Sequence, residues 1–136
     1  MTLLLAGAAA VIGALLGLVA LFWPAKAAEI VRLRPDWDVA GGFAEFRATF
    51  GGLLLMAHLA VLLAIVMREQ AGMASVIGAS FAVGAGWLGA AFGRGLSMLV
   101  DHREHRTRTR YNAFSTVFEL ALALALLAPW LEHLRR

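Results

Sequence analysis

Apolar residues fall into four long blocks along this chain, at about residues 2–23, 43–67, 73–100 and 111–130, and short charged stretches separate them. A helix that crosses the hydrocarbon core of a bilayer needs about 20 mostly apolar residues. The pattern therefore predicts four transmembrane helices, so that residues 1–136 form a single transmembrane domain. Short connections favour antiparallel neighbours. The predicted fold is all-α, an integral membrane antiparallel four-helix bundle.

The connection 24–44 differs from the other two because it mixes charged with apolar residues, and Pro35 divides it. This composition is typical of a short segment that lies at the level of the lipid headgroups. The first block could instead be a cleaved signal peptide, since Ala25-Lys26-Ala27 resembles a cleavage site. Its 22 apolar residues exceed the about 7–15 of a signal peptide, and no basic residue precedes them. We therefore predict a membrane anchor.

Composition agrees with a membrane protein and narrows the possible chemistry. Hydrophobic residues make up 61% of the chain and charged residues only 15%, a balance unlike that of soluble domains. The absence of cysteine excludes disulfides, thiolate metal sites and iron–sulfur clusters. The net charge of +3 does not indicate nucleic-acid binding, because the basic residues lie in the connections, where they set helix orientation.

The distribution of these cations predicts the orientation. With four spans, segment 24–44 and the link 101–110 share one side of the membrane, while both termini and the link 68–72 share the other. The first side carries seven lysines and arginines and the second carries three. The richer side belongs in the cytoplasm. We expect a bacterial inner-membrane protein with both termini periplasmic. The seven are Lys26, Arg32, Arg34, Arg103, Arg106, Arg108 and Arg110.

Glycines spaced four apart occur as Gly13 and Gly17 in the first block and as Gly89 and Gly93 in the third. Small residues at this spacing let the backbones of two membrane helices approach closely. Because glycine is common in membrane helices, we interpret both pairs as packing sites within one subunit, ahead of dimer contacts.

Five ionisable residues lie inside the predicted spans, where each costs about 2.5–3.5 kcal/mol near the bilayer centre unless it faces the interior and finds a partner. They are Glu45, Arg47, His58, Arg94 and Glu119. At a rise of 1.5 Å per residue, Arg94 and Glu119 both lie roughly 10 Å from the cytoplasmic face. We therefore predict an ion pair between Arg94 and Glu119.

Glu45 and Arg47 open the second span on the same side, so we expect them to join Arg94 and Glu119 in one polar core. Helical spacing supports this. Arg47 and His58 fall on one stripe of the second span, and the fourth span has a polar stripe of its own. The residues of second choice for the site are Asn112, Ser115, Thr116 and His58.

The polar core has two interpretations. It could bind a lipid headgroup, an anion or a coupling proton, or it could be a charge network that only fixes helix register. No second histidine lies at the depth of His58, which favours a hydrogen-bonded core histidine over a haem ligand. His102 and His105 lack a closed ligand set. We expect no metal and no cofactor.

The basic link 101–110 also suggests a partner besides the bilayer itself. Basic residues next to a membrane contribute about 1 kcal/mol each near an anionic leaflet. Anionic lipid headgroups are therefore candidate partners of Arg103, Arg106, Arg108 and Arg110.

The charged motifs resemble a bacterial membrane family known as domain of unknown function 4345. The similar stretches are Glu45-Phe46-Arg47-Ala48-Thr49-Phe50-Gly51-Gly52, Gly93-Arg94-Gly95-Leu96-Ser97 and Glu119. The link 101–110 departs from the family by being longer and more basic. The resemblance implies the four-span architecture and points to the same charged residues, but it implies no mechanism.

These observations predict a non-enzymatic membrane protein, either an accessory or assembly subunit of a larger complex or a lipid-contacting scaffold. The alternative is a small homo-oligomeric transporter or channel that uses Glu119 as a proton or substrate carboxylate. An enzyme ranks third, because the sequence has no recognisable nucleophile, metal set or cofactor motif. Other membrane subunits or further copies of the chain are the expected protein partners.

Overall fold

The computed structural model describes residues 1–34 and 41–135, and all regular structure in this part of the chain is helical. Four helical stretches are long and apolar enough to cross a membrane, which confirms the four helices predicted from the apolar blocks. The predicted break at Pro35 lies outside the described residues. In chain order the elements are α1 (Thr2–Phe22), α2 (Pro24–Ile30), α3 (Gly42–Phe46), η1 (Arg47–Leu53), α4 (Leu54–Val66), α5 (Arg68–Ala71), α6 (Met73–Val100), α7 (His102–His105) and α8 (Arg110–His133).

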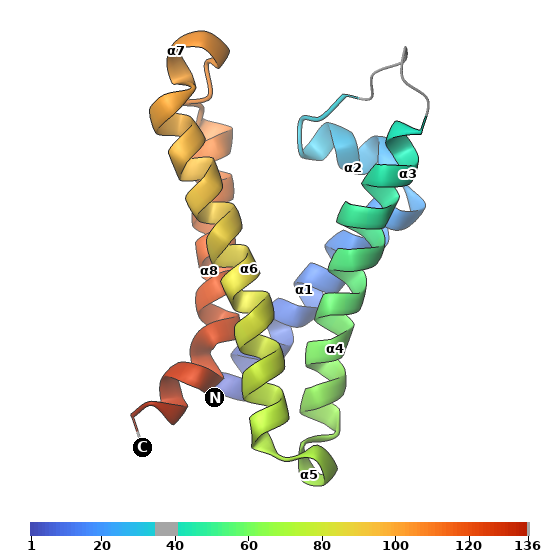
Figure 1. Cartoon of the computed structure of the whole chain (residues 1–136), viewed down its shortest axis with the longest axis vertical. Coiled ribbons are helices and arrows are strands. Elements are labelled where there is room, and N and C mark those ends of the chain that lie inside the picture. The colour runs from blue at the N-terminus through green and yellow to red at the C-terminus, as the bar shows by residue number, and fades with distance from the viewer. Residues whose placement is uncertain (35–40, 136) are drawn as a thin grey trace.

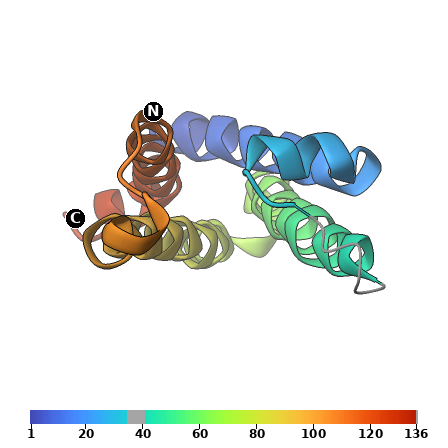
Figure 2. The same ribbon diagram turned by 90° about the horizontal axis from the view of Figure 1, so that it is seen from above.

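The long helices alternate in direction and form two antiparallel pairs (Figure 1). One pair is α1 with η1 and α4, and the other is α6 with α8. Further contacts join α1 to α8 and α4 to α6. Figures 1 and 2 show that the pairs converge near α5 and diverge toward the end that carries α2 and α7. The two pairs are therefore not packed together along their whole length, as they would be in the antiparallel four-helix bundle that the sequence predicts.

Glycines bring α1 close to its neighbour. A Cβ added at Gly17 would lie 2.5 Å from the backbone nitrogen of Leu55, and one added at Gly13 would lie 2.0 Å from Nε2 of His58. Gly13 and Gly17 therefore serve packing within the chain, as predicted. By contrast, a Cβ at Gly89 or Gly93 would meet no atom within 4 Å, so this second pair packs against nothing in the described part of the chain.

Two apolar clusters hold the helices together. The larger one is centred on Ala9, Ala10, Val61, Leu122 and Leu126, so α1, α4 and α8 all contribute to it. The smaller one lies where α2 packs against the ends of α1 and α3. Pro24 begins α2, a position where proline fits because a first-turn N–H has no helical partner. Figure 1 shows α2 beside α3, at the end of the pair formed by α1 and α4.

Candidate functional site

The strongest polar contact within the long helices joins α6 to α8. Nη2 of Arg94 donates to Oε1 of Glu119 at 2.6 Å, and Nε of Arg94 lies 3.1 Å from each carboxylate oxygen. Both oxygens of Glu119 therefore accept from one guanidinium, a geometry that combines charge with directional hydrogen bonds. The side chain of Glu119 is only 7% exposed, while that of Arg94 is 30% exposed. The predicted contact between Arg94 and Glu119 is present.

Polar groups of the 107–112 segment extend this contact. Oδ1 of Asn112 lies 3.5 Å from Nη1 of Arg94, and Nδ2 of Asn112 donates to the Thr107 carbonyl at 2.6 Å. The Thr107 hydroxyl donates to the Ser97 carbonyl at 2.8 Å, and Thr109 accepts from the backbone N–H of Asn112 at the start of α8. The link between α6 and α8 is thus fixed by hydrogen bonds that run from the ion pair to the helix ends.

The other two polar residues of the α8 stripe are less directly involved. Thr116 and Ser115 are both half-buried. The Thr116 hydroxyl donates to the Asn112 carbonyl at 2.9 Å, so it bonds to its own helix. Of the predicted stripe, only Asn112 and Glu119 contact Arg94.

Glu45 and Arg47 do not join this site. Both are exposed, and the elements that carry them, α3 and η1, pack on α1 and α2 and not on the hairpin of α6 and α8. No ion pair of the described residues includes Glu45 or Arg47. The four charges that the sequence predicts in one core therefore lie in two separate places.

A π-helical segment explains part of this difference. From Arg47 to Leu53 the backbone follows an i→i+5 pattern, so each turn holds about one residue more than an α turn. One extra residue rotates the preceding positions by roughly 100° about the helix axis. Gly51 and His58 are buried, but Arg47 is exposed, so the stripe predicted from regular α-helical spacing is wrong.

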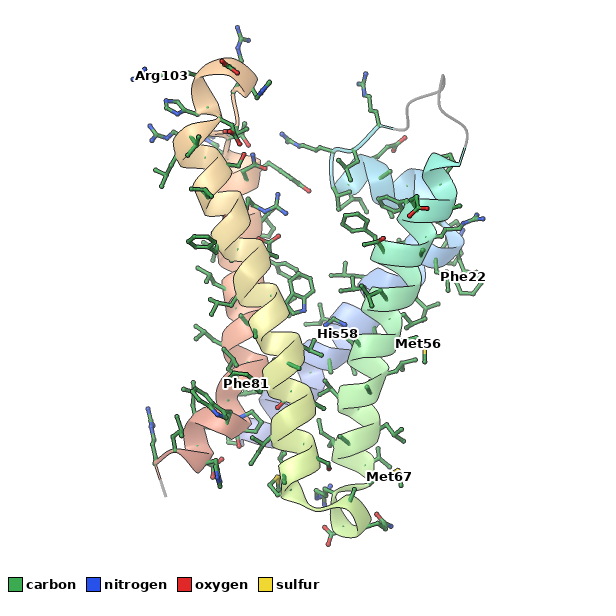
Figure 3. The ribbon with its side chains drawn as sticks, in the orientation of Figure 1. Phe22, Met56, His58, Met67, Phe81 and Arg103 are labelled. Carbon is green, nitrogen blue, oxygen red and sulfur yellow. The ribbon has the colours of Figure 1, made fainter. Side chains whose placement is uncertain are left out.

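His58 is a buried, fully hydrogen-bonded residue, as predicted. Its Nδ1 lies 2.6 Å from the Leu54 carbonyl, and Nε2 accepts from Nε1 of Trp87 at 2.8 Å. Figure 3 shows His58 on the side of α4 that faces the other helices, whereas Met56 and Met67 project outward. Because both ring nitrogens are engaged, His58 ties α4 to α6 and presents no free nitrogen to a ligand.

A second tie links the two helix pairs at their open end, and sequence reasoning missed it. The hydroxyl of Tyr111 on α8 donates to the carbonyl of Ile30 at the end of α2, and the guanidinium of Arg32 lies 4.0 Å above the Tyr111 ring. Arg32 has a positive φ of 60°, a conformation that costs a residue other than glycine about 1–2 kcal/mol. Nothing in the local sequence signals this conformation.

The remaining polar features lie at the ends of the molecule. Arg103, Arg106, Arg108 and Arg110 are all exposed, and Figure 3 shows Arg103 pointing away from α7. At the opposite end the Thr2 hydroxyl donates to the Glu132 carboxylate. In the described part of the chain, no group of three histidine, aspartate or glutamate side chains could hold a metal ion. Contact between the four arginines and anionic lipid stays a prediction.

Comparison with protein families, curated proteins and solved structures found no match to this chain.

Proposed function

We propose that this chain is a non-enzymatic protein of the bacterial inner membrane that serves as an accessory or assembly subunit of a larger complex or as a lipid-contacting scaffold. The observation that carries the proposal is the Arg94–Glu119 pair. Its charges are neutralised within one hairpin, and its carboxylate is buried. An ion pair of this kind fixes how α6 and α8 sit against each other, which is a structural task.

The surroundings of the pair support the same interpretation. Across the described residues, every buried side-chain nitrogen or oxygen has a hydrogen-bond partner. Two pockets of the described chain lie at its ends, and neither is lined by Arg94 or Glu119. Polar groups that bind a substrate or carry a proton normally converge on an accessible pocket. The pair is better suited to hold helices than to meet a ligand.

Large apolar side chains on the outer surface provide the contacts that a scaffold needs. Leu88, Phe92 and Leu96 are between 45% and 71% exposed along α6, and they share the helix with the unpacked glycines Gly89 and Gly93. Such a surface suits lipid chains, and small residues allow a neighbouring helix to approach closely. Transport through Glu119, the alternative function, would require this buried carboxylate to leave Arg94, and no observation favours it.

Purification in a mild detergent followed by native mass determination tests the proposed role. We expect the chain to run with other membrane subunits or, as a scaffold, with bound phospholipid. A chain that runs as a bare monomer and, after reconstitution, carries a solute across liposomes would contradict the proposal. The matched control for that flux assay is Glu119→Gln, because a transporter would lose flux while a scaffold would show none in either form.

The positions of α2 and α7 support placing segment 24–44 and the link 101–110 on one side of the membrane, which we propose is the cytoplasm, because both helices lie at the same end of the molecule (Figure 1). With seven cations at this end against three at the other, we expect both termini in the periplasm. A periplasm-active reporter fused after Arg136 should be active and a cytoplasm-active one silent. The opposite result would invert the proposed orientation.

A further inference from the structure

An open pocket of about 330 Å³ lies at the end of the molecule that carries α2, between the segment after α2 and the first turns of α3 and η1. Among its lining residues are Leu33, Arg34, Phe43, Glu45, Thr49 and Phe50. The pocket is distinct from the Arg94–Glu119 pair, since neither member of that pair lines it. Its volume lies at the lower end of the range of ligand pockets, about 300–1,000 Å³.

The pocket contains one cation and one anion that do not neutralise each other. Arg34 and Glu45 both line it, yet neither forms an ion pair with any residue that the structure describes. A guanidinium binds phosphate through directional, charge-assisted hydrogen bonds, and a carboxylate accepts such bonds from an ammonium group. A ligand that carries both a phosphate and an ammonium would satisfy both side chains at once.

Beside this charged pair, most of the pocket lining is apolar. Leu33 is 48% exposed and Phe50 is 40% exposed, and the Phe50 ring stacks on Phe46 with 4.8 Å between ring centroids. Phe46 also lines the pocket, and Phe43 adds a fourth large apolar side chain. Exposed apolar groups beside a charged pair favour a ligand that is itself part polar and part hydrocarbon.

The position of the pocket identifies where such a ligand would come from. Glu45 lies in the first turn of the second membrane-length helix, Gly42–Val66, so the pocket is at the depth where that helix leaves the hydrocarbon. Phospholipid headgroups occupy this level of a bilayer. Thr49 and Phe50 belong to the π-helical segment, and π-helical turns occur frequently at functional sites.

We propose that this pocket binds a zwitterionic phospholipid with a primary ammonium, of the phosphatidylethanolamine type. Arg34 binds the phosphate, Glu45 accepts from the ammonium, and an acyl chain runs along Phe43 and Phe50. A phosphatidylglycerol headgroup brings no cation for Glu45. A choline headgroup carries its positive charge without an N–H to donate. The inference rests on the proposed membrane location but not on the accessory role.

Native mass spectrometry of the detergent-solubilised full chain, titrated with phospholipids of matched acyl chains, tests the inference. We expect phosphatidylethanolamine to bind about tenfold more tightly than phosphatidylglycerol or phosphatidylcholine, the change of one well-formed charge-assisted contact. Glu45→Gln should abolish this preference, and Arg34→Gln should weaken binding of all three lipids. The matched controls are Arg135→Gln and Glu69→Gln, exposed charges outside the pocket and away from the basic link 101–110, which should leave every affinity unchanged.

Equal affinity of the wild-type chain for all three lipids would overturn the proposal, and so would unchanged selectivity in a folded Glu45→Gln variant. If a variant fails to fold, the selectivity of the wild-type chain decides alone. Soluble glycerophosphoethanolamine should compete poorly, and competition equal to that of the lipid would assign the pocket to a free headgroup instead. Flotation of the chain with vesicles separates the two proposals, because a chain that floats without lipid preference retains the membrane location and loses only this inference.

Discussion

Substituting Glu119 by glutamine should lower the free energy of unfolding by about 3–5 kcal/mol, because it leaves the Arg94 guanidinium within the hairpin without its counter-charge. The measurement is unfolding in detergent, followed by circular dichroism. Glu69→Gln is the matched control. Glu69 pairs with Arg68 at 3.3 Å, but their side chains are 78% and 44% exposed, so we expect little change.

A double variant tests whether stability is lost because the ion pair is absent or because Arg94 is left without a counter-charge. Arg94→Met with Glu119→Leu removes both charges and fills the space with apolar groups. Replacing a buried pair in this way is often neutral or stabilising, so most of the stability lost in Glu119→Gln should return. Wild-type stability in Glu119→Gln itself would contradict the structural role and turn attention to a functional one.

Gly17→Ala should disrupt the apolar part of the molecule although it adds only one methyl group. Its new Cβ would lie 2.5 Å from the Leu55 nitrogen and 2.8 Å from the Leu55 Cα. Backbone atoms cannot rotate away as a side chain can, so α1 must move off α4. Overpacking of this kind costs about 1–3 kcal/mol, and we expect a corresponding fall in stability in the same unfolding assay.

Gly89→Ala provides the control for this second experiment, since it makes the same chemical change on a helix surface where no atom lies within 4 Å. Alanine favours a helix more than glycine does, so the stability should be unchanged or slightly raised. If both variants lose the same stability, close approach of α1 to α4 is not the reason that Gly17 matters.

The sequence was sufficient to predict the helices and the Arg94–Glu119 contact, because both depend on regular features. Helix length follows from the length of each apolar block, and depth follows from a constant rise per residue. Arg94 and Glu119 lie on successive antiparallel helices joined by a short link, so equal depth was enough to bring them together.

The prediction that Glu45 and Arg47 join the polar core was wrong, and Arg47 lies where the regular α-helical geometry ends. A π-helical segment changes the direction of Arg47, and no residue type within it marks where the wider turns begin. The periodicity of apolar residues also could not predict which helices pair. The close approach at Gly17 and Leu55 depends on which helix faces meet in three dimensions. The bond between Trp87 and His58 was missed for the same reason.

The contact between Tyr111 and Ile30 has a consequence for the order in which the molecule is completed. The donor and acceptor are 81 positions apart in the chain, and the donor is in α8, the fourth long helix in chain order. When α2 has been synthesised, the Ile30 carbonyl still lacks this donor, because Tyr111 is added to the chain only later. The end of α2 therefore gains this hydrogen bond only after Tyr111 on α8 has been synthesised and lies beside it.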